Sequence, residues 1–281
     1  MTTTQPSSID QTPLDGPPPT SARDFQSPKL RRFSQPITLL RYLGHGHDGL
    51  VYEAVIPTTG LHVAVKMFWR TRQPARLRGG TRDIEWPFQH ECAVAAILEK
   101  MKYAIRRTKE HPNETIRLIG DPQNRKHAIH NFMAFCDERR TAQSSDPTYV
   151  SAPDFPRVPT CYGWTKVTRR GMPIYQPVDD DTFFWALVYE LVQDSQPVKD
   201  LTISQNVLDF FYQAGFTMAT YKENNWCGAT LLDMNDLCPP TFMYWHKSSW
   251  LRCDARVWFS PPRNYVDNGT LLADILSHGS K

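Results

Sequence analysis

Three glycines and a lysine are the residues of this chain best suited to bind a phosphate group. Gly44, Gly46 and Gly49 form a GxGxxG pattern that continues to Val51. Glycine has no Cβ, so the backbone of such a segment can approach a polyphosphate closely. Lys66 ends the apolar run Val63–Val65 and would supply a positive charge to the same phosphates.

The pattern around the glycines decides between three interpretations of them. A hairpin turn without function is one, and a dinucleotide-binding turn is another, but the latter needs a helix after the glycines. Here a strand is predicted at 50–55, between strands at 37–43 and 62–69, with a turn at 57–60. Three antiparallel strands in this order favour a phosphate-binding glycine hairpin.

A carboxylate that could pair with Lys66 lies on the next predicted element. Apolar residues recur at helical spacing over 88–105, and Glu91 lies near the start of this helix, with Glu99 as its alternative farther along. Taken singly, Lys66 and Glu91 are typical of a solvated surface. Together with the glycine pattern and the strand order, they favour a paired functional site.

Composition excludes several classes of protein. The 281 residues are 40% hydrophobic with a net charge of +3, which supports a sizeable core and does not indicate nucleic-acid binding. The six cysteines lack CxxC spacing, which argues against a zinc site. We see neither a secretory signal nor an apolar run long enough to span a membrane. We therefore expect a nuclear or cytoplasmic protein without a membrane partner.

The chain divides into three parts by composition. Residues 1–35 are rich in Ser, Thr and Pro and are predicted to be a disordered tail. Residues 36–192 hold the strands and the helix above, with basic insertions at 70–88 and 102–152. Residues 193–281 form the last part. Further elements are predicted as helices near 126–140 and 207–216, and as strands at 158–164, 183–192 and 230–232.

Residues 38–192 resemble the N-lobe of protein kinases. The resemblance rests on the glycine pattern, the Val-Ala-Val-Lys66 strand, Glu91, and the strands that contain Cys161-Tyr-Gly and Ala186-Leu-Val-Tyr-Glu-Leu. It implies an α+β fold with a five-stranded antiparallel sheet, a regulatory helix and a truncated, mainly helical C-lobe. It also implies ATP and magnesium as cofactors. The residues that would contact ATP are Gly44, Gly46, Gly49, Val51, Ala64, Lys66, Tyr189 (the gatekeeper position), and Glu190 and Leu191 through their backbone.

The second half departs from the kinase pattern. There is no His-Arg-Asp sequence, and the best placement of the catalytic loop makes Asn225 a magnesium ligand and puts Thr220 at the position of the base. A threonine cannot accept a substrate proton as a carboxylate does. Asp233 matches the magnesium-binding Asp, but Met234 and Asn235 replace the Phe and Gly that normally follow it.

The second half also resembles a fungal inner-kinetochore (Sim-four complex) subunit family with a degenerate kinase-like domain. The matching stretches are 158–164, 208–216, Asn225-Trp226 and 232–237. The resemblance implies protein partners in a larger assembly.

Three functions follow from these features. The first is a pseudokinase or nucleotide-binding scaffold, favoured by the missing base. The second is an active atypical kinase for a protein or small molecule, in which Asp233, Asp236 or another carboxylate replaces the base, because phosphoryl transfer depends mainly on positioning and charge. The third is an interaction module at chromatin that binds no nucleotide and uses the basic stretches at 70–82 and 100–109.

Overall fold

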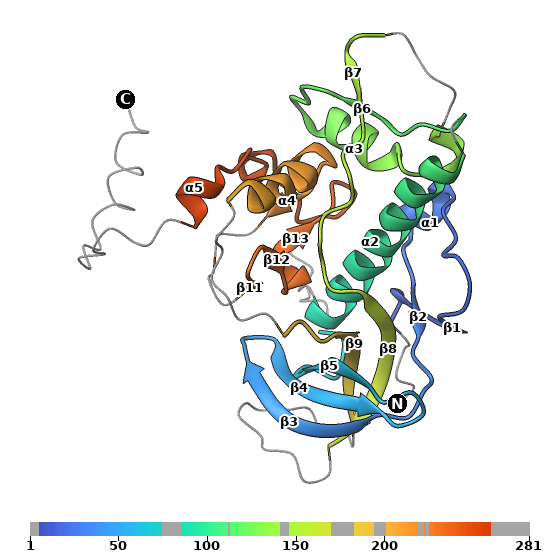
Figure 1. The fold of residues 1–281 in the computed structure, drawn as a ribbon, viewed down its shortest axis with the longest axis vertical. Helices are drawn as coiled ribbons and strands as arrows, with labels where there is room; N and C mark the ends of the chain where they lie inside the picture. The colour runs from blue at the N-terminus through green and yellow to red at the C-terminus, as the bar shows by residue number, and fades with distance from the viewer. Residues whose placement is uncertain are drawn as a thin grey trace, which may run out of the picture.

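A seven-stranded sheet forms one side of the protein in the computed structural model (Figure 1). The structure describes residues 6–74, 86–111, 113–140, 146–169, 183–193, 201–218, 222 and 225–259. The strand order is β1-β2-β8-β9-β5-β4-β3. The strands are β1 (Ile9–Pro13), β2 (Leu30–Arg32), β3 (Thr38–His45), β4 (Gly49–Ile56), β5 (Leu61–Phe68), β8 (Cys161–Thr168) and β9 (Phe183–Glu190). With its helices, the protein has an α+β fold.

Five of the six strands predicted from the sequence form the antiparallel part of this sheet, from β8 to β3. Alternation along β5 sends Val63, Val65 and Met67 into a core on one face. Ala64 packs against the core of the opposite face, so Lys66 also points to that second face. The period of two thus places the lysine on the side of the sheet where the long helix lies.

Helix α2 (Pro87–Glu110) crosses that second face of the sheet. Pro87 occupies the first turn, where its missing N–H is not needed, and neither Pro nor Gly interrupts the turns that follow. The side chains of Cys92, Ala96 and Met101 are fully buried in the larger of the two main cores. The predicted helix at 88–105 is confirmed and continues for five residues more, to Glu110.

A second group of elements lies above the sheet in Figure 1, partly beside α2 and partly around its far end. It contains the helices α3 (Arg125–Met133), α4 (Leu201–Gln213) and α5 (Ala255–Trp258). Short strand pairs join β6 (Arg117–Ile119) to β7 (Tyr149–Ser151), β10 (Thr217–Met218) to β13 (Leu237–Cys238), and β11 (Trp226–Cys227) to β12 (Thr230–Leu231). The 3-10 turns are η1 (Asp137–Arg139), η3 (Met234–Asp236) and η4 (Lys247–Ser249).

The predicted insertion at 102–152 is divided in the structure, because residues 102–110 are the end of α2 and the later residues form other elements. The buried Asn131 of α3 donates a hydrogen bond to the Gln213 carbonyl, 2.9 Å away, at the end of α4. Gly215 lies so close to α3 that a Cβ there would be 2.5 Å from the Ala128 carbonyl oxygen. The elements from β6 to β7 therefore belong to the second group, which mixes helices with short strands and is not mainly helical over its described residues.

The expectation of a disordered tail at 1–35 is also wrong for its described part, residues 6–35. It forms β1, helix α1 (Ala22–Gln26) and β2, and these two strands extend the sheet in parallel pairing. Ser21 begins α1 with a capping box to Asp24. Phe25 and Leu30 are fully buried, and Phe25 packs edge-on against Phe132. The prediction of disorder relied on the average composition of the segment, which is polar, and gave no weight to its few apolar residues.

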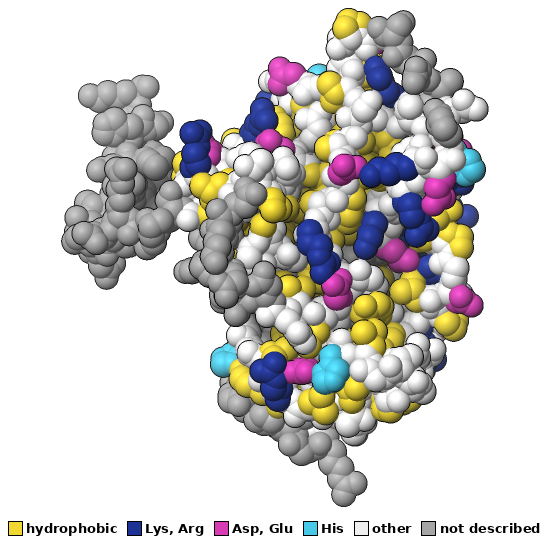
Figure 2. All heavy atoms as spheres, in the orientation of Figure 1, with side chains coloured by type: hydrophobic (Ala, Val, Ile, Leu, Met, Phe, Trp, Pro, Cys, Tyr) yellow, Lys and Arg dark blue, Asp and Glu magenta, His cyan; other side chains and the backbone are white. Residues whose placement is uncertain are grey.

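Charges of both signs alternate on the face shown in Figure 2. Basic side chains of the described residues have acidic partners, as Lys109 has Asp154 at 2.7 Å and Arg157 has Glu190. This pairing is typical of a solvated surface and does not form a continuous basic patch on this face. Among the described residues, no helix combines the length and apolar character that crossing a membrane requires.

Replacement of Phe25 by Ala tests whether the N-terminal segment belongs to the folded core. A fully buried Phe that is cut back to Ala leaves a cavity, so F25A should lower the free energy of unfolding by about 3–5 kcal/mol. The neighbouring exposed residue provides the control, and Gln26→Ala should change stability by less than about 0.5 kcal/mol. Urea unfolding followed by circular dichroism measures both. Equal stability of F25A and the wild type would mean that this segment does not pack in solution.

Candidate functional site

The Lys66 ammonium group lies between two carboxylates from distant parts of the chain. Its Nζ atom donates to Glu91 Oε2 at 2.6 Å and to Asp233 Oδ1 at 2.8 Å. Exposure of the three side chains is 14% for Lys66, 0% for Glu91 and 29% for Asp233. The structure thus brings together Lys66, Glu91 and Asp233, three of the residues predicted to form the site.

Three elements supply these residues. β5 directs Lys66 toward α2, and the first turns of α2 place Glu91 opposite it. β9 pairs with β5 so that Tyr189 lies across from Ala64, and the Tyr189 hydroxyl donates to Glu91 Oε1 at 2.9 Å. Asp233 caps η3 by accepting from the Asn235 N–H at 3.1 Å. Each Glu91 oxygen therefore has a donor, which offsets the desolvation of a fully buried carboxylate.

Burial and charge act in opposite directions on these groups. Burial by itself lowers the pKa of Lys66, but Glu91 and Asp233 outweigh it and hold that pKa above its ordinary value. Burial raises the pKa of Glu91 to about 7, against the opposing effect of Lys66. Burial also acts to raise the pKa of Asp233, yet Lys66 keeps it below its ordinary value. At neutral pH the site therefore holds a lysinium and an ionised Asp233.

The glycine hairpin closes over one end of this site. The Gly46 N–H donates to the Gly49 carbonyl at 2.9 Å, which makes a tight turn between β3 and β4. The turn is held by the Trp69 indole N–H, which donates to the Gly46 carbonyl at 3.3 Å. Asp48, at the tip of the turn, accepts from the Asn235 amide at 3.4 Å. The hairpin and the turn after Asp233 are therefore in direct contact.

The three glycines are needed for different reasons. A Cβ on Gly44 or Gly46 would meet no atom within 4 Å, so both backbones border open space. A Cβ on Gly49 would lie 2.0 Å from the Met67 carbonyl oxygen of β5. Packing against β5 by itself therefore requires glycine at position 49, and the predicted contact of all three glycines with a phosphate stays a prediction. Val51 and Ala64 are half-buried on the two strands beside the hairpin.

A second acidic group lies next to Asp233. Asp236 accepts a hydrogen bond from the Asn225 amide, and the Lys222 ammonium is 3.6 Å from its other oxygen. Burial raises the pKa of Asp236, against the effect of that hydrogen bond. The Asn225 amide nitrogen, whose oxygen is the predicted magnesium ligand, is therefore bound to Asp236. The predicted base position, Thr220, lies outside the described residues.

Carboxylate and amide oxygens of this kind suit magnesium, which prefers hard oxygen ligands and a few protein groups. Asp233 would hold the ion through its carboxylate and Asn225 through its amide oxygen. Within the described parts of the chain, no three His, Cys, Asp or Glu side chains are grouped to hold a metal ion by themselves. The donor set therefore fits an ion whose other ligands come from phosphate and water.

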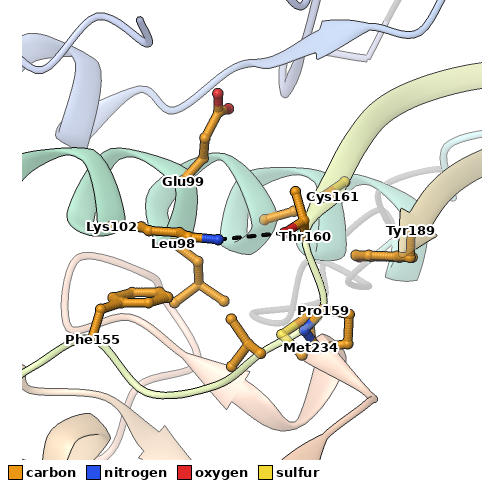
Figure 3. Close-up of a pocket in the computed structure, with 11 residues that line it drawn as sticks. Leu98, Glu99, Lys102, Phe155, Pro159, Thr160, Cys161, Tyr189 and Met234 are labelled. Carbon is orange, nitrogen blue, oxygen red and sulfur yellow. Dashed lines mark hydrogen bonds between the residues drawn. The ribbon is translucent and has the colours of Figure 1, made fainter. Parts of the chain in front are cut away.

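One of the backbone groups predicted to contact adenine, at the end of β9, already has a hydrogen-bond partner within the protein. The Glu190 N–H donates to the Thr160 carbonyl at 2.8 Å, so it is not available to a ligand. Leu191 is half-buried just past the end of β9. The Tyr189 ring points into an apolar pocket between α2 and segment 155–161, where Leu98 and Met234 also lie (Figure 3). Tyr189 therefore fills space behind the lysine and supports Glu91.

Sequence reasoning did not find several residues that complete the site. Asp48 and Lys222 had no assigned role, and the contact of Asp236 with Asn225 was not foreseen. The spacing of Lys222 three residues before Asn225 was the available signal, because both then meet the turn at 233–236. His90 is another such residue, and its Nε2 atom is 2.8 Å from the Leu237 carbonyl, which ties α2 to β13.

No family model matches the chain, and a search of curated proteins finds no match. The kinase and kinetochore resemblances therefore stay predictions, and the site is interpreted from its own geometry.

A pH series on Lys66→Met tests the electrostatics of the site. The pKa of Glu91 lies above its ordinary value of 4.5, so its contribution to stability is complete below pH 4.5 and is lost as pH rises through about 7. Without the lysinium this pKa rises further, and the loss continues to higher pH. K66M should therefore be more strongly destabilised at pH 9 than at pH 6, by about 1–3 kcal/mol, measured by urea unfolding.

The double variant Lys66→Met, Glu91→Gln is the control, because it removes the group that titrates. Its stability relative to Glu91→Gln should change less between pH 6 and pH 9 than the stability of K66M relative to the wild type. Both variants without Lys66 also lose the group that holds the pKa of Asp233 down, so the pH dependence that remains in the double variant is the contribution of Asp233. A K66M penalty of equal size at both pH values would contradict the assignment of the raised pKa to Glu91.

Proposed function

We propose that this chain is a kinase-like nucleotide-binding protein that acts as a pseudokinase or scaffold, with weak or no phosphotransfer. The observation that carries the proposal is the contact of Lys66 with both Glu91 and Asp233, at 2.6 and 2.8 Å. A strand lysine, a helix glutamate and a later aspartate beneath a glycine hairpin are the parts that hold ATP and magnesium in kinases. The antiparallel sheet with one helix across it supports the same interpretation of the fold.

Nucleotide would enter between the glycine hairpin and the turn at 233–236. The α- and β-phosphates would take the place of Asp233 on the Lys66 ammonium, while Glu91 keeps the lysine in position. Asp233 would then be free to bind magnesium, whose role is to neutralise phosphate charge. The open space beside Gly44 and Gly46 supports this path. Binding also requires the contact between Asp48 and Asn235 to open, which sets a cost on nucleotide affinity.

The residues proposed to bind nucleotide are all present, but the carboxylate that would act as the base in phosphotransfer is missing. The base position holds Thr220, whose hydroxyl does not accept a proton as a carboxylate does. Asp233 is engaged by Lys66 in the absence of nucleotide. A protein of this kind would bind nucleotide to stabilise one surface for protein partners. The resemblance to fungal inner-kinetochore subunits makes a larger nuclear assembly the setting that we propose for those partners.

Asp236 favours a second candidate function, an active atypical kinase. Its carboxylate is held by the Asn225 amide and lies 3.6 Å from the Lys222 ammonium. Burial raises its pKa, and a general base works best when its pKa approaches the working pH. In this alternative Asp236 would accept the substrate proton in place of the missing base. Loss of phosphotransfer in Asp236→Asn, with nucleotide affinity kept, would support it.

Thermal unfolding with and without ATP and magnesium tests the proposed function. Nucleotide at a hundred times its Kd should stabilise the folded state by about 2.7 kcal/mol, which raises Tm by several degrees. Lys66→Met should remove this shift, because the phosphates lose their cation. Asp233→Asn should keep a shift with ATP alone but lose the further gain from magnesium.

Lys109→Met is the matched control for the lysine variant. Lys109 is 65% exposed near the far end of α2 and pairs with Asp154, so its loss should leave the ATP shift intact. A wild-type protein with no shift at millimolar ATP would exclude the nucleotide-binding proposal and leave an interaction module. A shift that persists undiminished in K66M would place the nucleotide elsewhere.

A further inference from the structure

We infer that the N-terminal strap, residues 6–34, is a positioning element for the Lys66–Glu91 pair, and that Arg31 is its central positioning residue. The strap consists of β1, α1 and β2 and lies along α2 in Figure 1. It contacts neither Lys66 nor Asp233 through any described hydrogen bond, yet it packs against the helix that carries Glu91. The expected effect on nucleotide affinity rests on the proposed function. The expected effect on the mobility of α2 rests on the contacts of the strap alone.

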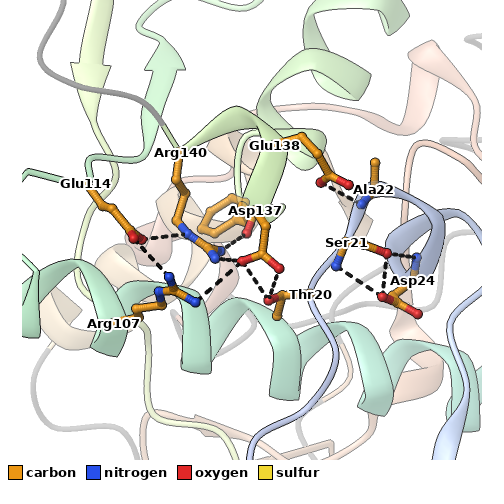
Figure 4. A network of polar contacts seen from close by, with 10 residues as sticks. Thr20, Ser21, Ala22, Asp24, Arg107, Glu114, Asp137, Glu138 and Arg140 are labelled. Carbon is orange, nitrogen blue, oxygen red and sulfur yellow. Dashed lines mark hydrogen bonds and ion pairs between the residues drawn. The ribbon is translucent and has the colours of Figure 1, made fainter.

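The strap makes polar contacts at three positions along α2, two with the helix itself and one with Asp137 of η1 beside it. Near the beginning of α2, the Gln89 amide donates to the Ser7 hydroxyl at 2.8 Å. In the middle, Arg31 pairs with Glu99 at 3.1 Å. At the far end, the Thr20 hydroxyl donates to Asp137, which also lies 3.9 Å from Arg107 (Figure 4). The whole length of the helix is therefore held from one side.

Arg31 joins three parts of the chain through one guanidinium group. It donates to the carbonyls of Asp15 and Gly16 at 2.7 and 2.9 Å, and to the Glu99 carboxylate at 3.1 Å. Its side chain is 9% exposed, so these bonds are largely shielded from water and salt. The same residue thus closes the loop of the strap between β1 and α1 and fixes that loop to α2.

The sheet is shaped to accept the strap. Gly163 in β8 has a φ of +116°, and a Cβ there would lie 2.6 Å from the Arg31 carbonyl and 2.9 Å from the Phe33 nitrogen. The Phe33 N–H donates to the Trp164 carbonyl at 2.8 Å, and the Trp164 indole donates to the Asp10 carbonyl at 2.8 Å. Glycine at 163 is therefore required for the close approach of β2 to β8.

Contacts on the other side of α2 explain why its position matters for the site. There the turn η3 packs against the helix, and His90 contacts the Leu237 carbonyl. Glu99 follows Glu91 by eight residues, or about 12 Å along a rigid helix, so anchoring Glu99 restricts the movement of Glu91. The strap on one side and the segment after Asp233 on the other thus set the distance from Glu91 to Lys66.

Replacement of Arg31 or Glu99 tests the inference with two measurements. In Arg31→Ala and Glu99→Ala, affinity for ATP with magnesium should fall about tenfold, in the usual range for coupled sites. Amide hydrogen exchange over residues 88–98 should become faster than in the wild type. Glu99→Ala keeps both bonds of Arg31 to the strap carbonyls, so it gives a folded protein if Arg31→Ala does not. Glu99→Gln keeps an acceptor for Arg31 and should stay near wild type.

Glu138→Gln is the control variant for general loss of stability. It weakens the bond from the Ala22 N–H to Glu138, which attaches the strap to η1 and not to α2. This variant should keep nucleotide affinity and slow exchange at 88–98. If Glu99→Ala matches Glu138→Gln in affinity and in exchange, the strap has only a structural role and the inference is overturned.

The two proposals fail in different ways. A wild-type protein that binds no nucleotide refutes the proposed function, and hydrogen exchange of α2 then decides the positioning role by itself. A wild-type protein that binds nucleotide, with Glu99→Ala equal to it in affinity and exchange, refutes the positioning role and leaves the proposed function in place.

Discussion

The relative positions of the sheet, α2 and η3 depend on Lys66, a largely buried lysine that stays charged. A buried ammonium is costly unless carboxylates surround it, and removal of one partner of such a group is strongly destabilising. Lys66 has two such partners, Glu91 from a helix and Asp233 from a turn far along the chain. Because each partner comes from a different element, the pairing fixes the sheet, the helix and the turn relative to one another.

The other features of the fold can be understood as support for that pairing. β5 sends Lys66 to the helix side of the sheet, and Tyr189 in β9 gives Glu91 a second donor. The N-terminal strap holds α2 from one side, and the turn η3 with Asp233 holds it from the other. The contact of Asp48 with Asn235 brings the glycine hairpin down to the same turn. A ligand that replaced Asp233 on the lysine would therefore affect β5, α2, the turn η3 and the glycine hairpin.

Sequence patterns predicted the parts of the structure that depend on local periodicity. The five antiparallel strands and α2 followed from alternation and helical spacing. The pairing of Lys66 with Glu91 and the place of Asp233 near them followed from the resemblance to kinases, and the direct contact of Lys66 with Asp233 was not predicted. Packing between distant segments was not predictable in this way. The strap was mistaken for a disordered tail because Phe25 and Leu30 are rare apolar residues in a polar segment. The role of Gly49 depends on the Met67 carbonyl of the neighbouring strand, and the placement of α3 depends on Gly215 after α4.

Photolabelling with 8-azido-ATP in the presence of magnesium tests the central claim most directly, because it maps where the adenine binds. The account predicts saturable labelling of β5 near Ala64 or of the segment from Tyr189 to Leu191, identified by mass spectrometry of peptides. Unlabelled ATP should suppress this labelling, and Lys66→Met should abolish it. Saturable labelling confined to other segments, or no saturable labelling at all, would contradict a nucleotide site built around Lys66.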